Sequence, residues 1–361
     1  MILTIFIAFF SLIGLVVLHE LGHFIMAKRF GVKVEEFGVG LPPRIFGKKF
    51  GETIYSINLL PFGAFVKIYG EEKSIEDYRS FSQKPIWQRV FIIIGGVVVF
   101  WIVAFVILSI VMVLGVTTIV DDEANHNLVD SKVQIVQVVA NSPAETAGLR
   151  IGDTVRELEA DDGRLVTDKE KEVRDFIAAN RGEKIIFKIQ RGSEIFETSL
   201  TPRYPPPEKE GAAGIALART ATVKYSWYRA PLEGLSATVN LTIAVIQGWV
   251  MILKNIVIGE GLPPGAQILG PVGIMNVFTQ MAQLGINYFL RFIALISIYL
   301  AVFNILPIPA LDGGKLVFLG IEAVRKKPVP QGIEQKLTIF FFALLMILIA
   351  WATIRDIIRI F

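Results

Sequence analysis

The chain has 361 residues, of which 53% are hydrophobic and 19% are charged, and its formal net charge is +3 at pH 7. Its mean hydropathy of +0.56 is well above that of a soluble domain and indicates an integral membrane protein. No basic run suggests a nucleic-acid partner. Cysteine is absent and histidine occurs three times, which excludes disulfides, a thiol nucleophile and thiolate metal ligands.

Four apolar segments are long enough to span a bilayer, which takes about 20 residues. They lie at about residues 2–27, 86–116, 286–323 (an interrupted run) and 337–361. The first is too long for a signal-peptide core and follows no cationic stretch, so we expect a retained span. Lysine and arginine concentrate in the loops after the first span and before the last. The positive-inside rule therefore places both loops in the cytoplasm, and the two termini and residues 117–287 outside.

The first span contains the run His19-Glu20-Leu21-Gly22-His23. On a helix, His19 and His23 project from one face, one turn apart. This spacing lets two imidazoles bind one Zn²⁺, with Glu20 beside the metal as the general base. Ionisable groups within a membrane span are costly and usually mark function. We therefore expect a metal site here rather than a chance occurrence of the motif. Its third ligand has to be His126 or a carboxylate, because no other histidine exists.

Residues 32–69 are rich in glycine and in residues that favour strands. The runs 53–60 and 63–68 predict short strands separated by Gly and Pro turns. This segment is apolar for a cytoplasmic loop, so we expect it to be associated with the membrane and to dip in beside the metal site. Such a backbone is tolerated only where protein or a water-filled cavity covers it. The alternative is a small interfacial sheet.

Residues 117–203 are expected to form an α+β unit outside the membrane. A strand at 133–139, a charged helix at 168–180 and strands at 184–190 and 195–200 are predicted. The run Ser142-Pro143-Ala144 followed by Ala147-Gly148-Leu149 and Gly152-Asp153 resembles bacterial PDZ domains, which implies binding of peptide termini by addition to a sheet edge. Only one copy is present. His126 lies among acidic residues just before the globular part of this unit, which begins at about residue 130, and we interpret it as a solvated surface residue.

Residues 204–285 are expected to connect this unit to the third span. The run Tyr204-Pro205-Pro206-Pro207 predicts a stiff linker. Residues 232–258 form a moderately apolar pattern with interspersed polar residues, which favours an amphipathic helix on the outer surface. The alternative is a fifth span, which would reverse the orientation of everything after it.

Pro307 and Pro309 interrupt the third span shortly before Asp312. Two prolines cannot lie in an undisturbed helix, and a break inside a membrane is acceptable where the freed backbone lines a polar site. Asp312 needs a partner at this depth. Counting from the outer ends of their spans places both Asp312 and His19 toward the cytoplasmic leaflet. Asp312 then completes two imidazoles and one carboxylate, leaving a fourth position for water, as catalytic zinc requires. The alternative for Asp312 is a helix cap.

These motifs together resemble the site-2 protease family of intramembrane zinc metalloproteases, and above all the bacterial group of the regulator-of-sigma-E protease. The resemblance implies one zinc ion held by His19, His23 and Asp312, with Glu20 as the catalytic base. It also implies that Asn304 and Pro307, in the run 304–313, contact substrate. Well-studied members carry two PDZ domains in tandem, whereas this chain has one. Their location implies a multi-pass protein of the bacterial cytoplasmic membrane with its PDZ domain outside.

We therefore expect a polytopic α-helical membrane protein with four transmembrane helices, a β-rich segment and one PDZ domain. Its expected reaction is hydrolysis of peptide bonds in the transmembrane segments of single-span proteins, such as anti-sigma factors and remnant signal peptides. A substrate helix must unwind before its backbone can be attacked, and a strand edge can pair the freed groups. We expect residues 53–68 to do so, with Tyr55 and Ile57 at edge positions. The alternatives are a non-catalytic PDZ scaffold in the membrane and a transporter.

Overall fold

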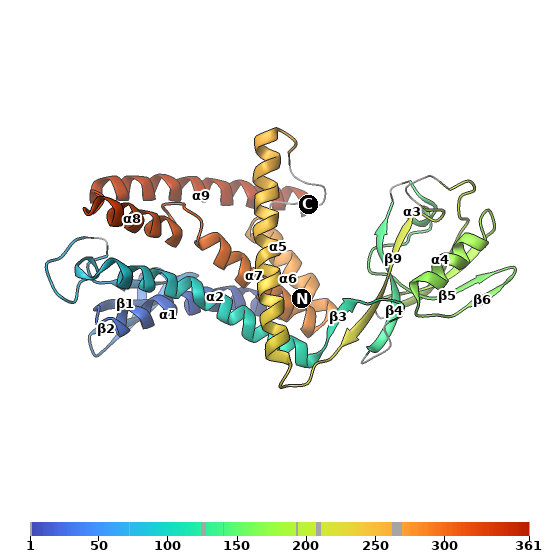
Figure 1. Ribbon diagram of the computed structural model, residues 1–361, viewed down its shortest axis with the longest axis horizontal. Helices are drawn as coiled ribbons and strands as arrows, with labels where there is room; N and C mark the ends of the chain where they lie inside the picture. The colour runs from blue at the N-terminus through green and yellow to red at the C-terminus, as the bar shows by residue number, and fades with distance from the viewer. Residues whose placement is uncertain are drawn as a thin grey trace. The chain divides into compact units, whose positions relative to one another are not determined.

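A computed structural model describes residues 2–71, 73–123, 128–139, 141–192, 194–206, 211–261 and 269–360 (Figure 1). His126, expected at the surface, lies outside these residues. The chain divides into two compact units. The first comprises Met1–Ile110 and Pro231–Phe361, and the second comprises Val111–Ala230.

The first unit is mostly helical, with one β-hairpin. Its helices are α1 (Ile2–Arg29), α2 (Ile86–Leu114), α5 (Ala230–Ile258), α6 (Pro271–Leu284), α7 (Ile286–Asn304), α8 (Asp312–Arg325) and α9 (Gln331–Ile360). Its strands are β1 (Val34–Phe50) and β2 (Thr53–Ile68), and a short 3-10 helix, η1 (Phe81–Gln83), follows them.

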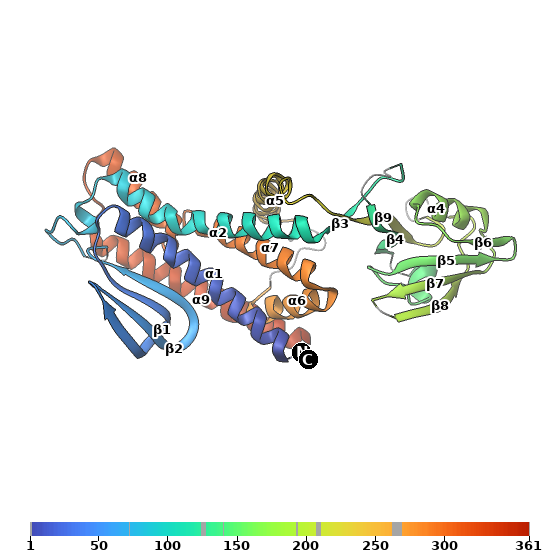
Figure 2. The same ribbon diagram turned by 90° about the horizontal axis from the view of Figure 1, so that it is seen from below.

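Five helices in the described part of the chain are long and apolar enough to cross a membrane: α1, α2, α5, α7 and α9. The four segments expected to span all contain such a helix, but α5 adds a fifth, so the expected number of four is not confirmed. The interruption of the third span takes the form of a break between α7, which ends at Asn304, and α8, which begins at Asp312. Figures 1 and 2 show that α5 crosses α2 instead of running parallel to it.

Helices α1 and α2 approach closely because glycines face each other. A Cβ built on Gly22 would lie 2.4 Å from the carbonyl oxygen of Gly95, so only glycine permits this separation. Apolar side chains fill the space on either side of the contact. One cluster joins α1 and α2 to α6 and α7, and another joins them to the hairpin and α8. These two clusters therefore hold α1, the helix that carries the two histidines, against α2 and the elements packed on either side of it.

The hairpin is a curled two-stranded sheet in which β2 pairs with β1 twice. Residues 54–57 pair with residues 36–39 on one side and with residues 46–49 on the other. Residues 64–68 pair only with residues 34–39 and form an edge. The expectation that Tyr55 and Ile57 occupy edge positions is therefore wrong, because both of their backbone sides are already paired.

Much of the hairpin's surface is apolar. Five large side chains are more than half exposed: Ile45, Phe46, Phe50, Ile57 and Leu59. Large exposed apolar side chains in this number indicate contact with a membrane or a partner. Glu52, in the turn of the hairpin, pairs with Lys28 at the end of α1 and with Arg79 in the loop after β2. These two cations hold the pKa of the Glu52 carboxyl below its usual range.

The second unit is α+β. A sheet of seven strands runs in the order β3-β9-β4-β5-β7-β8, with β6 on β5 (Figure 2). The strands are β3 (Val116–Ile119), β4 (Leu128–Val138), β5 (Thr154–Ala160), β6 (Gly163–Leu165), β7 (Ile185–Arg191), β8 (Glu194–Leu200) and β9 (Ile215–Val223). Helices α3 (Pro143–Thr146) and α4 (Glu170–Ala179) complete the unit. Because β9 pairs with both β3 and β4, the expected end of this domain at residue 203 is too early.

Candidate metal centre and catalytic site

Two helices that are far apart in the sequence bring three metal-ligand side chains together. His19 and His23 project from one face of α1, and their Nε2 atoms lie 3.2 Å apart. Asp312, at the first position of α8, places its Oδ2 3.2 Å from Nε2 of His19 and 3.3 Å from Nε2 of His23. All three residues are buried, each about 7% exposed. The cluster joins the two motifs whose meeting the sequence predicted.

Neighbouring groups set the orientation of both imidazoles. Nδ1 of His23 lies 2.9 Å from the carbonyl oxygen of Ile92, to which it donates, and this leaves Nε2 with a free lone pair. The ring of His19 stacks on Phe100, with ring centroids 4.6 Å apart. Space for His23 exists because α2 has Gly96 opposite it, where a Cβ would lie 2.2 Å from Nε2.

The break between α7 and α8 delivers Asp312 to this point. The chain turns through Pro307 and then restarts as a helix whose first turn contains Gly313 and Gly314. A Cβ on Gly313 would lie 2.2 Å from the carbonyl oxygen of Leu306, so the returning loop packs directly over the new helix. The N-cap position belongs to Leu311, without a side-chain hydrogen bond. The carboxylate of Asp312 instead points at the two imidazoles.

The arrangement fits a zinc ion. Three lone-pair donors converge on one point, and Oδ2 of Asp312 has no hydrogen-bond partner among the described residues. Ligand atoms on a tetrahedral zinc, at about 2.0–2.1 Å from the metal, are about 3.3–3.4 Å from one another. The observed separations of 3.2–3.3 Å are close to this value. Two histidines and one carboxylate leave a fourth position open, as catalytic zinc sites do.

Glu20 lies beside the cluster without belonging to it. Its Oε2 accepts a hydrogen bond of 3.1 Å from the backbone N–H of Val66, on the edge segment of β2. The side chain is half-buried. A carboxylate next to a metal, yet free of the ligand cluster, is suited to accept a proton from water.

The other expected site residues lie at different places. Asn304 is the last residue of α7, and its Nδ2 donates to the carbonyl oxygen of Leu300 at 2.9 Å. Pro307 lies in the break itself. Tyr55 packs near Phe24 of α1, with ring centroids 6.1 Å apart. None of these three joins the described metal-ligand cluster.

Sequence reasoning missed two features next to this centre. One is the contact between Val66 and Glu20. The other is an ion pair of 2.7 Å between Nζ of Lys315 and Oε1 of Glu71. The one available signal for the second was the presence of a lysine one helical turn after Asp312, near the membrane, where a charge needs a partner.

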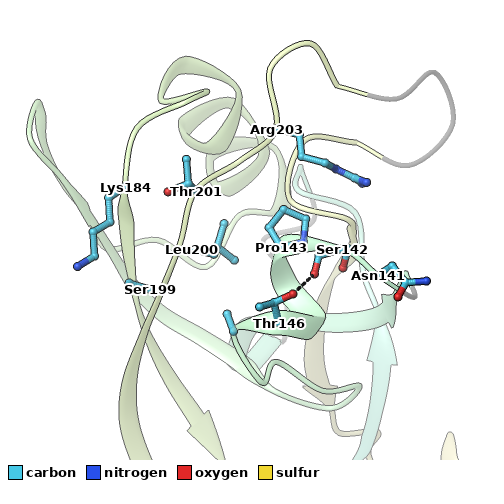
Figure 3. Close-up of a pocket in the computed structure, with 10 residues that line it drawn as sticks. Asn141, Ser142, Pro143, Thr146, Lys184, Ser199, Leu200, Thr201 and Arg203 are labelled. Atoms are coloured by element: carbon cyan, nitrogen blue, oxygen red, sulfur yellow. Dashed lines mark hydrogen bonds between the residues drawn. The ribbon is translucent and has the colours of Figure 1, made fainter.

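The second unit contains a pocket of about 480 Å³ between α3 and the end of β8 (Figure 3). Ser142 caps α3 by accepting a hydrogen bond of 3.2 Å from the backbone N–H of Glu145. Nearby, Asp153 pairs with Arg191 at 2.7 Å. In the PDZ-like run, Ser142 therefore stabilises the start of α3, and Asp153 stabilises a turn by its ion pair with Arg191. The pocket is lined by hydroxyl and apolar side chains, with Lys184 and Arg203 at its sides, and it brings no catalytic group together.

Comparison with known proteins identifies relatives over both units. The sequence model of Peptidase family M50 matches residues 7–348. A Clostridium perfringens protein named as a candidate zinc metalloprotease is 33% identical over 345 residues, covering 96% of each chain. The regulator of sigma-W protease RasP of Bacillus subtilis is 28% identical over an alignment of 437 positions, which covers 98% of each chain. The zinc metalloprotease RasP of Bacillus licheniformis is 29% identical over an alignment of 442 positions, which covers 98% of this chain and 99% of the relative.

Proposed function

The chain belongs to Peptidase family M50 and is a membrane zinc metalloprotease, and from this premise we propose that it hydrolyses peptide bonds inside the transmembrane segments of single-span proteins. The observation that carries the proposal is the convergence of Asp312 with His19 and His23 of the membrane-length helix α1, with Glu20 beside them. A protease centre among membrane helices can reach bonds that lie in the bilayer.

In this proposal His19, His23 and Asp312 hold one zinc ion and Glu20 is the general base. Zinc bound there supplies a Lewis acid for the scissile carbonyl and for the attacking water. Glu20 accepts the proton of that water and passes it to the leaving amine. Ile92 and Phe100 hold the two imidazoles in place while this happens. The rival function, a non-catalytic PDZ scaffold, would leave the complete set of ligands and base without a use.

Substrate is proposed to unwind and pair with the edge of the hairpin. An unwound helix exposes backbone polar groups, each costing several kcal/mol in lipid. Residues 64–68 form an edge beside Glu20 that can pair with them by strand addition. A substrate carbonyl would take over the N–H of Val66. Asn304 and Pro307 are proposed to contact the substrate from the other side of the break. Tyr55 and Ile57 are not proposed to do so, because they do not lie at an edge of the sheet.

The second unit is proposed to be a PDZ domain on the extracytoplasmic side of a bacterial cytoplasmic membrane. Its α+β fold, its open sheet edges and the Ser142–Asp153 run support this assignment. Such a unit would bind peptide termini of substrates. The Bacillus subtilis relative is named as a regulator of sigma-W, which supports anti-sigma factors as one substrate class, alongside remnant signal peptides.

Cleavage of a model single-span protein in lipid vesicles tests the proposal. We expect the purified protein to cut within the transmembrane segment, as located by mass spectrometry of the products. Glu20→Gln should slow cleavage by at least about 100-fold, which is the usual minimum contribution of a general base. Normal cleavage by Glu20→Gln, or cuts only outside the membrane segment, would show that the proposal is wrong.

A further inference from the structure

In the edge segment of β2, residues 64–68, two residues direct their backbone N–H and C=O groups away from β1. Pairs in an antiparallel ladder alternate between those that exchange hydrogen bonds and those that do not. Val66 pairs with Phe37, yet its N–H donates to Glu20, so its backbone groups point away from β1. Ala64, two residues earlier in the same register, has the same orientation. The outward groups of the edge therefore face the base of the proposed reaction.

The far end of this edge is tied to the helix that carries Asp312. Glu71 follows β2 after a short turn, in which its own N–H donates to the carbonyl oxygen of Ile68. Oε1 of Glu71 lies 2.7 Å from Nζ of Lys315. Lys315 lies three residues after Asp312, so both project from the same face of α8. The ion pair thus joins residues that are 244 positions apart in the sequence.

Apolar contacts alone would leave the position of the strand along α8 poorly defined. Val66 and Ile68 belong to the same hydrophobic cluster as Leu316 and Leu319 of α8. Such contacts are non-directional. A charged pair is directional, and near a membrane each charge is costly without its partner. The side chain of Glu71 is 19% exposed and that of Lys315 is 43% exposed, so the carboxylate is the member of the pair that most needs its partner. The pair therefore supplies what the cluster lacks, a defined register between the strand and the helix.

We propose that Lys315 is a positioning residue: through Glu71 it holds the edge of β2 in register with Glu20 and the metal centre, so that a paired substrate strand presents its scissile bond to both. The inference rests on the proposed proteolytic function. Lys315 itself touches neither the metal-ligand cluster nor, in this account, the substrate. The charge of Lys315 also acts on Glu20 and Asp312, so the position of the strand is tested by the variants of Glu71 as well as by those of Lys315.

Two metal-binding probes separate this role from the integrity of the centre. Acetohydroxamic acid can bind only the metal, whereas a peptide hydroxamate can bind the metal and also pair with the edge. In Lys315→Met and in Glu71→Gln, the peptide hydroxamate should bind about 10- to 100-fold more weakly, since a misplacement of about 1 Å can cost up to about 100-fold. Affinity for acetohydroxamic acid and zinc content should stay within about two-fold of the unmodified protein, because the ligands are untouched.

A matched control lies on the same helix. Glu322 of α8 pairs with Arg89 of α2 at 3.0 Å, so Glu322→Gln weakens an ion pair without involving the edge. The ratio of the two probe affinities should be unchanged in this variant. Exchanging the charges, with Lys315→Glu and Glu71→Lys together, should restore at least part of the ratio that each single change loses.

The outcomes distinguish two failures. If the unmodified protein cleaves its substrate and Lys315→Met and Glu71→Gln keep the normal probe ratio, Lys315 is not a positioning residue, although the protease function stands. An equal loss of ratio in Glu322→Gln would assign the effect to α8 in general and overturn the inference. If the unmodified protein neither holds zinc nor cleaves, it is the proposed function that fails. If Lys315→Met fails to fold, the ratio of the two probe affinities is measured in Glu71→Gln, whose changed residue lies in a loop.

Discussion

Glycine positions determine whether the metal-binding side chains can meet. Gly22 lets α1 approach α2, Gly96 leaves room for the imidazole of His23, and Gly313 lets the returning loop pack over Asp312. At each place a Cβ would lie within about 2.4 Å of another atom. At Gly22 and Gly313 that atom belongs to backbone, which cannot move aside as a flexible side chain can. At Gly96 it is the imidazole itself.

At this scale Gly96→Ala gives a direct test. The added methyl group would overlap Nε2 of His23, and overpacking of this kind costs about 1–3 kcal/mol. We expect the variant to be inserted in the membrane but to lose most of its bound zinc, as measured by metal analysis of the purified protein. Gly14→Ala is the matched control, because nothing lies within 4 Å of a Cβ there. Equal zinc contents in the two variants would contradict the geometry given for His23.

The ionisable residues of the site could be predicted from the sequence, whereas the residues that position them could not. His19, Glu20, His23 and Asp312 are conspicuous because ionisable groups in apolar runs need a common partner. Their meeting in space matches the expectation. Glu71, and the fit of Gly96 to the imidazole of His23, carry no such local signal. Their importance depends on which atoms of distant helices and strands they contact, and one-dimensional patterns do not contain that information.

At the scale of elements, the hairpin differs most from expectation. Periodicity correctly predicted strand structure in residues 53–60 and 63–68. It could not predict that one curled strand would pair with β1 along both halves, because pairing is a non-local property. Gly63, with a φ of 96°, allows the backbone to turn between the halves. The half expected to be an edge is therefore interior, and the half nearer Glu20 is the edge.

Proline substitutions separate the two halves. Ala64→Pro removes an N–H that points outward, which an edge strand tolerates. We expect this variant to keep its fold and zinc but to cleave slowly, because a donor for the substrate strand is lost. Tyr55→Pro removes a donor from an interior segment and should disrupt the sheet, seen as faster proteolysis of residues 34–68. Full activity of Ala64→Pro would remove the edge from the account of substrate binding.

At the scale of the whole molecule, α5 decides the topology. Composition makes it a fifth candidate span. It crosses α2 instead of running parallel to it (Figures 1 and 2), and its location at the outer surface stays a prediction. Sequence alone left both alternatives open, because a 29-residue helix of intermediate apolarity is compatible with either.

The absence of cysteine makes this topology measurable with single introduced cysteines. Tyr228→Cys and Glu260→Cys flank α5 at exposed positions. Both should react with a membrane-impermeant reagent from the outer side, together with Ile151→Cys in the second unit. Tyr78→Cys, in the loop between α1 and α2, should react only after the inner side is opened. Reaction of Tyr228→Cys and Glu260→Cys from opposite sides would make α5 a span and reverse the orientation of α7 and α9.

The most direct test of the central claim is the zinc content of three purified proteins measured together with their cleavage rates. We predict one zinc per chain in the unmodified protein and in Glu20→Gln, with cleavage only in the first. Asp312→Asn should bind zinc more than about 100-fold more weakly, since even an outer-shell change costs 10- to 100-fold. Full zinc occupancy in Asp312→Asn, or loss of zinc in Glu20→Gln, would contradict the assignment of ligands and base.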